Sequence, residues 1–352
     1  MTFEFTALRN FRSFREFRAA WGAGLNLVLG PNGAGKTNLL ESLSILAGWG
    51  PFAGRAGRTV AWDAPGGRAL LKARAAGEEG HEIEVLLSSR MTIRAEGKRV
   101  RCTDVRLMIP SIAFLPTDIN LIDGSPAARR LFVDKLCALY HPPYARRLAE
   151  FHQISRHRAA LLRQGRPVRG TTLPFARLGG WVMEARRHVV SRLAALLTGA
   201  GWGADHFVHS HFTNFTFSLS MTPALECGGA EYLLGVLEET AQRELHALRP
   251  LVGPGRDDLN ILTNGRPAAD ALSRGQKRRL VLSLILTAGR LMEARLKKTP
   301  VLLFDDLAAE LDAEGRRTAG EVLLNTGWQV FVTGTDNPFP GLGDAPHILQ
   351  LA

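Results

Sequence analysis

Cysteine is scarce in this chain: 3 of its 352 residues are cysteines, and the number is odd. Cys102, Cys137 and Cys227 lie far apart, and none belongs to the C-x-x-C spacing that is typical of zinc-binding or redox sites. Small secreted proteins that depend on disulfides have more cysteines at closer spacing. The sequence therefore predicts no disulfide framework, and three reduced, buried thiols in a cytoplasmic protein.

Long apolar runs are also missing. A helix that crosses a bilayer needs about 20 consecutive apolar residues, whereas the longest run in the C-terminal third covers residues 280–289 and is flanked by charged residues. We expect this run to be a buried helix and not a membrane span. The first residues alternate between apolar and polar side chains and show no basic stretch before an apolar one, so no export signal is expected.

Positive charge is in excess. The chain has 44 Lys and Arg against 33 Asp and Glu, which gives a formal net charge of +11. Residues 116–234 contain 14 of the basic and 8 of the acidic residues, so part of the excess is concentrated there. A strongly basic protein is expected to bind a polyanion. The alternative is an arginine-rich composition with solvated side chains, and charge alone does not separate the two.

Residues 30–37 read GPNGAGKT and follow an apolar run at 25–29, which predicts a strand, a phosphate-binding loop and a helix. In such a loop, glycines let backbone N–H groups surround phosphate oxygens, Lys36 reaches the outer phosphates and Thr37 binds Mg²⁺. A turn that merely needs glycines would not explain Lys and Thr at this spacing. The nucleotide-binding residues predicted here are Gly30, Pro31, Asn32, Gly33, Ala34, Gly35, Lys36, Thr37 and Asn38.

A second string, LSRGQ at residues 272–276, precedes an apolar helix. Ser273 and Gln276 have the spacing of a capping box, which stabilises the start of a helix. A serine hydroxyl, a glycine N–H and a helix N-terminus can also bind an anion, and both roles can hold together. We therefore predict that Ser273, Arg274, Gly275 and Gln276 bind nucleotide, and that Ser273 and Gly275 act on the γ-phosphate of ATP held by a second subunit.

A third string, VLLFDD at residues 301–306, predicts a strand that ends in two carboxylates. Asp305 stands where the Mg²⁺ ligand belongs, and Asp306 is placed to polarise the attacking water. ABC proteins usually carry Glu at the second position, so the shorter Asp predicts slow hydrolysis. Asp312, in the LAAELD sequence that follows, is expected to act on the partner's nucleotide. Thr335, in TGT at residues 333–335, is expected to sense the γ-phosphate where transporters have a switch histidine.

The pattern along the chain predicts an α/β fold. Phe3, Phe5 and Ala7 alternate with polar residues as in a strand, and residues 68–100 contain several strand-like segments separated by turns. Ser125 and Pro126 then begin a series of helices that extends to about residue 197, the last of them from about 178, and residues 211–221 alternate as a strand. We expect an ATPase head, with a parallel sheet carrying the phosphate loop and an antiparallel sheet, formed by residues 1–115 and 235–352. A mainly helical arm is expected at residues 116–234.

Together the three strings narrow the prediction to the ATPase class that ABC transporters share with the structural-maintenance-of-chromosomes (SMC) proteins. In that class two copies must meet before ATP is fully enclosed. No sustained heptad repeat appears, and the separation from Thr37 to Ser273 is too short for the very long coiled coil of SMC proteins. Two alternatives stay open: a transporter ATPase subunit, and a nucleotide-gated scaffold with no useful hydrolysis.

The chain resembles the RecF family of bacterial recombination mediators over nearly its full length. Several of the matching strings are specific to that family and are not shared with ABC ATPases at large. The matching strings are LRNFRSF (8–14), GPNGAGKTNLLES (30–42), FLPTDINLIDGSPAARRLFVD (114–134), GPGRDDL (253–259), LSRGQKRRLVL (272–282) and LLFDDLAAELD (302–312).

This resemblance implies an SMC-like head with a short arm, which dimerises on ATP and is a weak, DNA-stimulated ATPase. It also implies binding of gapped DNA near junctions between single and double strands, and cooperation with RecR and RecO in placing RecA on gaps. By the same resemblance Asn10 and Arg12 touch the nucleotide. The chain departs from the pattern at the Q-loop, where no glutamine is found and Asp118 is the nearest candidate.

Overall fold

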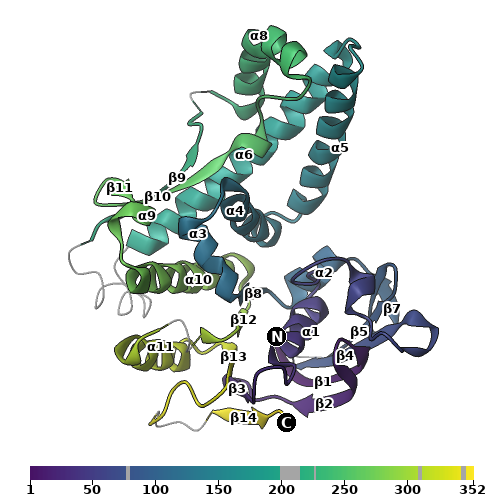
Figure 1. Cartoon of the computed structure of the whole chain (residues 1–352), viewed down its shortest axis with the longest axis vertical. Helices are drawn as coiled ribbons and strands as arrows, with labels where there is room; N and C mark the ends of the chain where they lie inside the picture. Colours follow the sequence, from purple (N-terminus) through teal and green to yellow (C-terminus); the bar gives the residue numbers. More distant parts are fainter. Residues whose placement is uncertain (77–79, 199–214, 226, 308–310, 342–345) are drawn as a thin grey trace. The chain divides into compact units, whose positions relative to one another are not determined.

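The computed structural model describes residues 1–76, 80–198, 215–225, 227–307, 311–341 and 346–352 (Figure 1). The chain divides into two compact units. Among the described residues, the first unit comprises 1–118 and 273–352, and the second comprises 119–198 and 215–272. Each unit is taken by itself below.

One layer of the first unit is an antiparallel sheet. Its described strands, in order across the sheet, are β2 (Phe14–Ala20), β1 (Thr2–Phe11), β4 (Ala69–Ala76), β5 (His81–Leu87), β6 (Met91–Ala95) and β7 (Lys98–Val100). The strand expected from the alternation of Phe3, Phe5 and Ala7 is present, with Phe3 buried and Phe5 37% exposed. The register of β1 against β4 shifts between these two residues, and such a bulge moves every later side chain to the opposite face.

The second layer of this unit is a parallel sheet. Its described strands are β14 (His347–Gln350), β3 (Leu25–Leu29), β13 (Gln329–Gly334), β12 (Val301–Phe304) and β8 (Ser111–Phe114). Every residue of β3, β12 and β13 is buried. Parallel strands are covered on both faces, which is why they appear in the sequence as continuous apolar runs and not as alternating ones.

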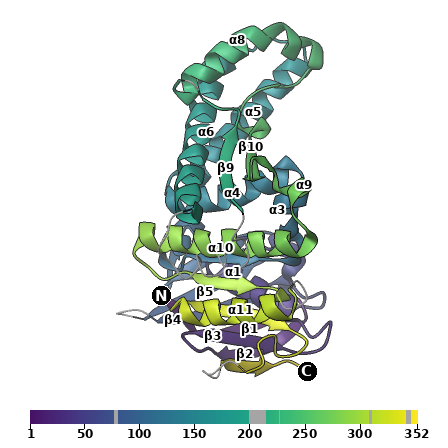
Figure 2. The same cartoon turned by 90° about the vertical axis from the view of Figure 1, so that its left-hand side faces the viewer.

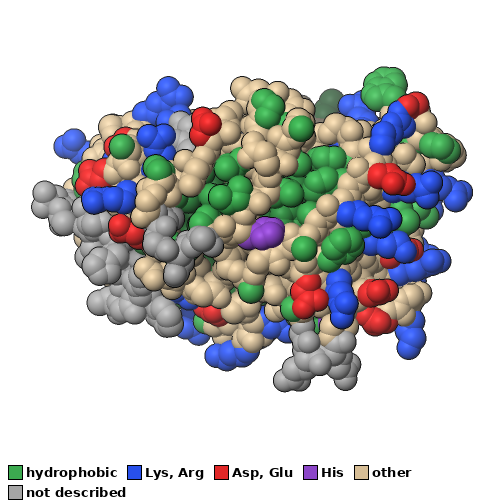
Figure 3. Space-filling view, turned by 90° about the horizontal axis from the view of Figure 1, so that it is seen from below, with side chains coloured by type: hydrophobic (Ala, Val, Ile, Leu, Met, Phe, Trp, Pro, Cys, Tyr) green, Lys and Arg blue, Asp and Glu red, His purple; other side chains and the backbone are tan. Residues whose placement is uncertain are grey.

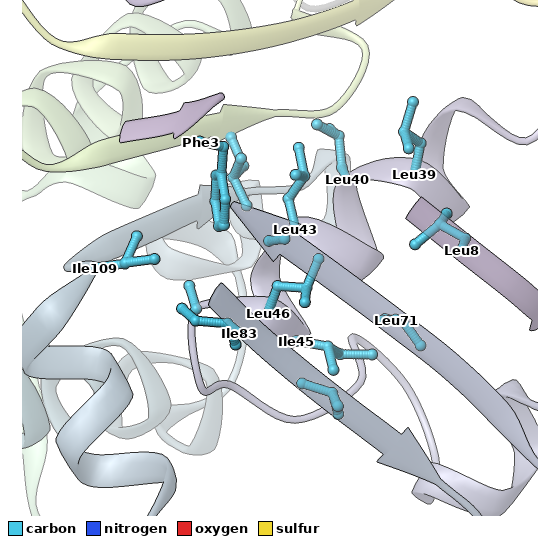
Figure 4. Close-up of a cluster of buried hydrophobic side chains, with 14 of the residues drawn as sticks. Phe3, Leu8, Leu39, Leu40, Leu43, Ile45, Leu46, Leu71, Ile83 and Ile109 are labelled. Carbon is cyan, nitrogen blue, oxygen red and sulfur yellow. The ribbon is translucent and has the colours of Figure 1, made fainter. Parts of the chain in front are cut away.

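Helix α1 (Lys36–Leu46) lies between the two sheets and contacts strands of both. All its residues from Leu39 to Leu46 are buried. Figure 4 shows its leucines meeting apolar side chains of β1, β4 and β5, among them Phe3 and Leu71. Burial of one such side chain contributes about 1.5–3 kcal/mol to folding. The core is therefore centred on the helix that directly follows the phosphate loop.

Other helices complete the first unit: α2 (Cys102–Met108), α10 (Arg274–Leu296) and α11 (Ala313–Asn325). Residues 280–289 of α10 are all buried, so the prediction of a buried helix for this apolar run is confirmed. Within the described parts of the chain, no helix is both long enough and apolar enough to span a membrane. On the face seen in Figure 3, apolar side chains gather in the middle, with Lys and Arg interspersed among Asp and Glu toward the margins.

The second unit is mainly helical. Its elements are α3 (Asn120–Asp123), α4 (Pro126–Tyr140), α5 (Tyr144–Arg163), α6 (Arg169–Thr198), β9 (Phe217–Thr222), α8 (Gly229–Ala247), β10 (Asp258–Thr263), β11 (Arg266–Pro267) and α9 (Ala268–Ala271). Helix α6 lies beside α5 and α8 (Figure 2). Gly180 of α6 and Gly229 of α8 approach so closely that a Cβ at either position would collide with the backbone of the other helix.

The second unit runs on to residue 272, whereas the sequence placed the end of the arm at 234. The reason is packing: β10 pairs with β9 along its whole length, and α8 lies against α6. Helix α6 also begins at Arg169, ahead of the predicted start near 178. Pro174 removes a single backbone hydrogen bond near the beginning, which a helix of 30 residues tolerates. Of the predicted strand at 211–221, residues 211–214 lie outside the described part.

Buried ion pairs hold this second unit together. Arg158 of α5 donates hydrogen bonds of 2.7 and 3.1 Å to Glu244 of α8, and both side chains are almost fully buried. Arg186 of α6 pairs with the buried Asp257 at 3.0 Å and with Asp134, whose side chain is partly exposed, at 2.9 Å. The cysteines are all free, but only Cys137 is buried; the prediction of three buried thiols is wrong for Cys227, which is exposed, and Cys102 is partly exposed.

Candidate nucleotide-binding site

A cavity of about 390 Å³ lies in the first unit where β3, β12 and β13 end. The carboxyl edge of a parallel sheet is where such folds bind ligands. The cavity therefore collects side chains that are far apart in the sequence. Its lining residues are Asn32, Gly33, Gly35, Lys36, Thr37, Asn38, Pro116, Asp305, Asp306 and Thr333.

The phosphate loop (residues 30–37) forms one wall of this cavity. Gly33 and Gly35 adopt left-handed backbone conformations, with φ of 88° and 95°, which cost glycine little and other residues more. Gly35 is also the N-cap of α1, and a Cβ at this position would lie 2.9 Å from both Ser13 and Phe14. The loop can therefore pack against the β1–β2 turn only with glycine here. The positive end of α1 faces the cavity, an arrangement that favours anions.

Lys36 bends back over the phosphate loop. Its Nζ donates hydrogen bonds of 2.6 Å to the Gly30 carbonyl and 2.9 Å to the Pro31 carbonyl. An ammonium group has three N–H donors, so one remains for a ligand in the cavity. The positive charge is thus held at the loop before any nucleotide arrives.

Asp305 is the centre of the polar contacts in the cavity. The Thr37 hydroxyl donates to its carboxylate at 2.8 and 3.0 Å, and the Thr333 hydroxyl donates to it at 2.8 Å. Asp305 itself is only 7% exposed. A carboxylate beside a hydroxyl is the kind of oxygen set that Mg²⁺ prefers. Thr37 and Asp305 therefore fit the metal that the sequence predicts for this position.

Asp306 lines the same cavity but is exposed. Its backbone is left-handed, with φ of 51°, and its N–H donates a 2.8 Å hydrogen bond to the Thr333 hydroxyl. A residue other than glycine in this conformation costs about 1–3 kcal/mol, and such residues concentrate at functional sites. Thr333 thus holds both acids, one through its side chain and one through its backbone.

Two residues predicted from the sequence lie differently from expectation. Among the described residues that line the cavity, Thr333 appears and Thr335 does not; Thr335 is exposed and its hydroxyl contacts Asp336 at 3.4 Å. Asp118 accepts a 2.7 Å hydrogen bond from the Leu115 N–H, while its neighbour Pro116 lines the cavity. Thr333 could have been found from the sequence, because it stands at the end of a buried strand, as Asp305 does.

Asn10 lies near the end of β1, and Arg12 lies in the β1–β2 turn, where it contacts α1. Both have left-handed backbones, with φ of 56° and 53°. The Arg12 guanidinium donates two hydrogen bonds, of 2.7 and 2.9 Å, to Glu41 of α1, and these hydrogen bonds raise the pKa of Arg12 above its usual value. Glu41 is 2% exposed and was missed by sequence reasoning, because it lies within an otherwise apolar helix. The sequence signal that could have identified Glu41 is an acidic residue among the leucines that directly follow the phosphate loop.

The LSRGQ string begins α10 as predicted. The Ser273 hydroxyl accepts from the Gln276 N–H at 3.4 Å, and Gln276 accepts from the Ser273 N–H at 2.9 Å, which confirms the capping box. Ser273, Arg274 and Gly275 are exposed. Asp312 caps α11 through a 2.8 Å hydrogen bond from the Gly315 N–H. Neither Ser273 nor Asp312 is found among the described residues that line the cavity.

Comparison with known proteins shows which family this chain belongs to. A family model described as an AAA domain matches residues 7–90. The DNA replication and repair protein RecF of Roseiflexus castenholzii is 32% identical to this chain, and the match covers 94% of the chain and 92% of the relative. The chain belongs to the RecF family. A second RecF, from Heliobacterium modesticaldum, is 29% identical over 93% of the chain and 91% of its own length.

Solved structures agree on the fold. The recombination mediator protein RecF-ATPrS in the RecFOR pathway has a TM-score of 0.86 at 22% identity, covering 99% of this chain and 96% of that one. An SMC head bound to the C-winged helix domain of ScpA has a TM-score of 0.55 at 15% identity, covering 96% and 90%. The predicted ABC/SMC-like α/β head is thus confirmed. Membership of the RecF family argues against the transporter alternative.

Proposed function

We propose that this RecF-family chain is an ATP-dependent DNA-binding protein of the cytoplasm that dimerises around two ATP molecules and acts on gapped DNA. It would bind where single and double strands meet and help RecR and RecO to place RecA. The observation that carries the proposal is the hydrogen bond from Thr37 to Asp305, which joins the phosphate loop to the acidic end of β12 in one cavity. Relatives named DNA replication and repair proteins support it.

ATP binding follows from the charges around the cavity. Lys36 and the N-terminus of α1 would face the β- and γ-phosphates, while Asn32, Gly33 and Asn38 line the space beside them. Thr37 and Asp305 would hold Mg²⁺, which when bound neutralises charge on the phosphate oxygens. The hydroxyl of Thr333 keeps Asp305 in place through a 2.8 Å hydrogen bond.

Hydrolysis depends on Asp306 in this proposal. Its carboxylate would orient the attacking water and accept its proton, while the Thr333 hydroxyl holds the backbone of Asp306 at the cavity. An Asp side chain reaches less far than the usual Glu, so turnover is expected to be slow and to rise when DNA is bound. The shorter side chain also keeps the second candidate, a nucleotide-gated scaffold without useful hydrolysis, in consideration. Turnover measured with and without DNA separates the two.

In this proposal, dimerisation brings Ser273, Gly275 and Asp312 of one chain to the ATP bound by the other chain. None of the three is among the described residues that line the cavity. Ser273 and Gly275 stand exposed at the N-terminus of α10. In a two-fold pair they would meet the γ-phosphate held by the partner, with Asp312 beside them. A phosphate at this helix end gains from the dipole and from the free N–H groups of the first turn.

DNA binding rests on charge and on the family. The net charge of +11 favours binding of a polyanion, and exposed arginines lie along α5 and in the loop that follows it. Arg158 is excluded from this role because it is buried in its pair with Glu244. The exposed set is Arg146, Arg147, Arg156, Arg163, Arg166 and Arg169.

Sedimentation tests the whole proposal. The chain would be sedimented with ATP and with ADP, each with and without gapped DNA, at fixed salt concentration. We expect a dimer with ATP and a monomer with ADP, and co-sedimentation of DNA with the ATP form. A monomer under all conditions would contradict the shared ATP site, and a dimer that never binds DNA would contradict the DNA function.

A further inference from the structure

Trp62 is fully exposed, with a relative accessible surface of 105%. Trp21 and Trp328 of the same unit are instead 8% and 1% exposed. A tryptophan side chain has a large apolar surface, about 150–250 Å², and leaving it in water forgoes the stabilisation that its burial would give. A single exposed Leu or Ile needs no explanation, but an indole that projects wholly into solvent does.

The backbone around Trp62 is held in place. Val60 forms a β-bridge with Phe11, and the Ala61 N–H donates a 2.9 Å hydrogen bond to the Asn10 carbonyl. Beyond Trp62, the Ala64 N–H donates to the Ala61 carbonyl at 3.1 Å, which closes a turn. The indole therefore stands at the tip of an anchored turn. Such a placement fixes the backbone from which the ring projects before a ligand arrives, which reduces the backbone entropy lost on binding.

Exposed arginines are frequent in the segment that contains this turn. Asp63, the next residue, pairs with Arg15 of β2, which brings that arginine to the base of the turn. The Arg15 side chain is still 52% exposed in this pair. Arg58, on the 3-10 helix Ala56–Thr59, is exposed, and its carbonyl accepts from Arg12 at 3.3 Å. Arg55 and Arg68 are exposed at the two ends of the same segment. Residues 55–68 thus contain three arginines, Arg55, Arg58 and Arg68, against a single acid, Asp63.

We propose that Trp62 is a stacking platform for a base of single-stranded DNA, with Arg15 and Arg58 contacting the phosphates beside that base. An exposed aromatic ring flanked by cations is the arrangement that binds single strands without regard to sequence. In a duplex the faces of the bases are stacked on one another, so the ring has nothing to bind. The inference rests on the proposed DNA function and specifies which strand of a gapped substrate this surface takes.

Three variants test it: Trp62→Ala, Trp62→Phe, and Ile348→Ala as a control. Ile348 is 51% exposed on β14 and apolar, and the same truncation there removes apolar surface without touching the turn. Binding of labelled oligo(dT) and of a duplex of equal length would be measured by fluorescence anisotropy at one salt concentration, in the presence of ATP. ATP affinity and ATP-dependent sedimentation would be measured on the same proteins.

We expect Trp62→Ala to weaken oligo(dT) binding about 5- to 150-fold, the range that corresponds to losing one stacked base. Trp62→Phe should retain most of the affinity because a ring remains, and Ile348→Ala should bind like wild type. Duplex binding and ATP affinity should not change for any variant.

Other outcomes overturn the inference. Equal oligo(dT) binding by wild type and Trp62→Ala would remove the platform while leaving the DNA function intact, whereas a wild type that binds neither DNA would remove the DNA function itself. Reduced ATP affinity in Trp62→Ala would instead assign the ring to the adenine of the nucleotide. Loss of ATP-dependent dimers with normal oligo(dT) binding would assign it to the subunit interface.

Discussion

Arg279 donates a hydrogen bond of 2.5 Å to the carboxylate of Asp312. Arg279 belongs to α10, which begins at the LSRGQ string, and Asp312 is the N-cap of α11. The two strings predicted to act on a partner's nucleotide are thereby joined within one chain.

Ser273→Arg separates a capping role from a role in trans. If the serine only caps α10, its loss costs about 1 kcal/mol of stability and leaves association unchanged. If it meets the partner's γ-phosphate, the bulk and charge of Arg leave ATP binding by the monomer near normal but prevent ATP-induced dimers and hydrolysis. Sedimentation with ATP measures the difference. A Ser273→Arg protein that dimerises like wild type would refute the shared site.

A mixture makes that prediction sharper. Ser273→Arg chains mixed with Lys36→Met chains can form a heterodimer that contains one composite site with an intact phosphate loop and an intact serine. Each variant alone should be inactive, and the mixture should recover part of the ATPase rate. If the mixture stays as inactive as its parts, the site is not shared in trans.

Lys36→Met should abolish nucleotide binding while the fold remains. The substitution removes the ammonium but keeps most of the length of the side chain, and of the two carbonyls that lose their donor only that of buried Gly30 is shielded from water, whereas Pro31 is exposed. ATP affinity by calorimetry and thermal unfolding give the two readouts. Lys98→Met, at an exposed position on β7, is the matched control and should bind ATP normally. Retained ATP affinity in Lys36→Met would contradict the assignment.

Asp306→Asn should separate binding from hydrolysis. The amide keeps the size of the side chain but cannot accept a proton from water, so hydrolysis should fall about 100-fold or more. ATP should still bind and should keep the dimer closed, as seen by sedimentation. Asp305→Asn provides the contrast, because it weakens the predicted Mg²⁺ site and should reduce ATP affinity itself. An unchanged rate in Asp306→Asn would place the proton acceptor elsewhere.

Glu244→Ala should destabilise the second unit by about 3–5 kcal/mol, since it leaves the buried Arg158 guanidinium without its countercharge. Glu150→Ala removes an acid from the exposed i,i+4 pair with Arg146 and should cost less than about 1 kcal/mol. Urea unfolding of the two variants measures the comparison. Equal losses would mean that burial does not set the strength of the Arg158 pair.

DNA affinity should fall steeply with salt if arginines neutralise phosphates. For duplex DNA the log–log slope is about −0.9 for each phosphate contacted, and sequence should matter little. Titrations at several salt concentrations in the presence of ATP give the slope. If binding does not respond to salt, the basic side chains of the chain are solvated and do not contact DNA phosphates.

Much of the site could be predicted because its parts are local. The strand, glycine loop and helix at residues 25–46 follow from an apolar run, left-handed turn positions and a helix start, all within a short segment. The capping box of Ser273 and Gln276 is likewise contained in a single turn. These features involve neighbours in the chain, so the sequence pattern contains the relevant chemistry. The predicted catalytic roles rest on these positions and await the experiments above.

The sequence by itself therefore determined the fold class, the phosphate loop and the two acids, since each depends on residue types at short spacing. Only the tertiary structure decided that Thr333 lines the cavity and holds Asp305, that Thr335 is exposed, and that Glu41 holds Arg12. It also decided that a bulge turns Phe5 outward and that Trp62 stands in solvent. These outcomes depend on which distant segments meet and on a register shift of a single residue. A pattern of residues along one strand or helix does not contain that information.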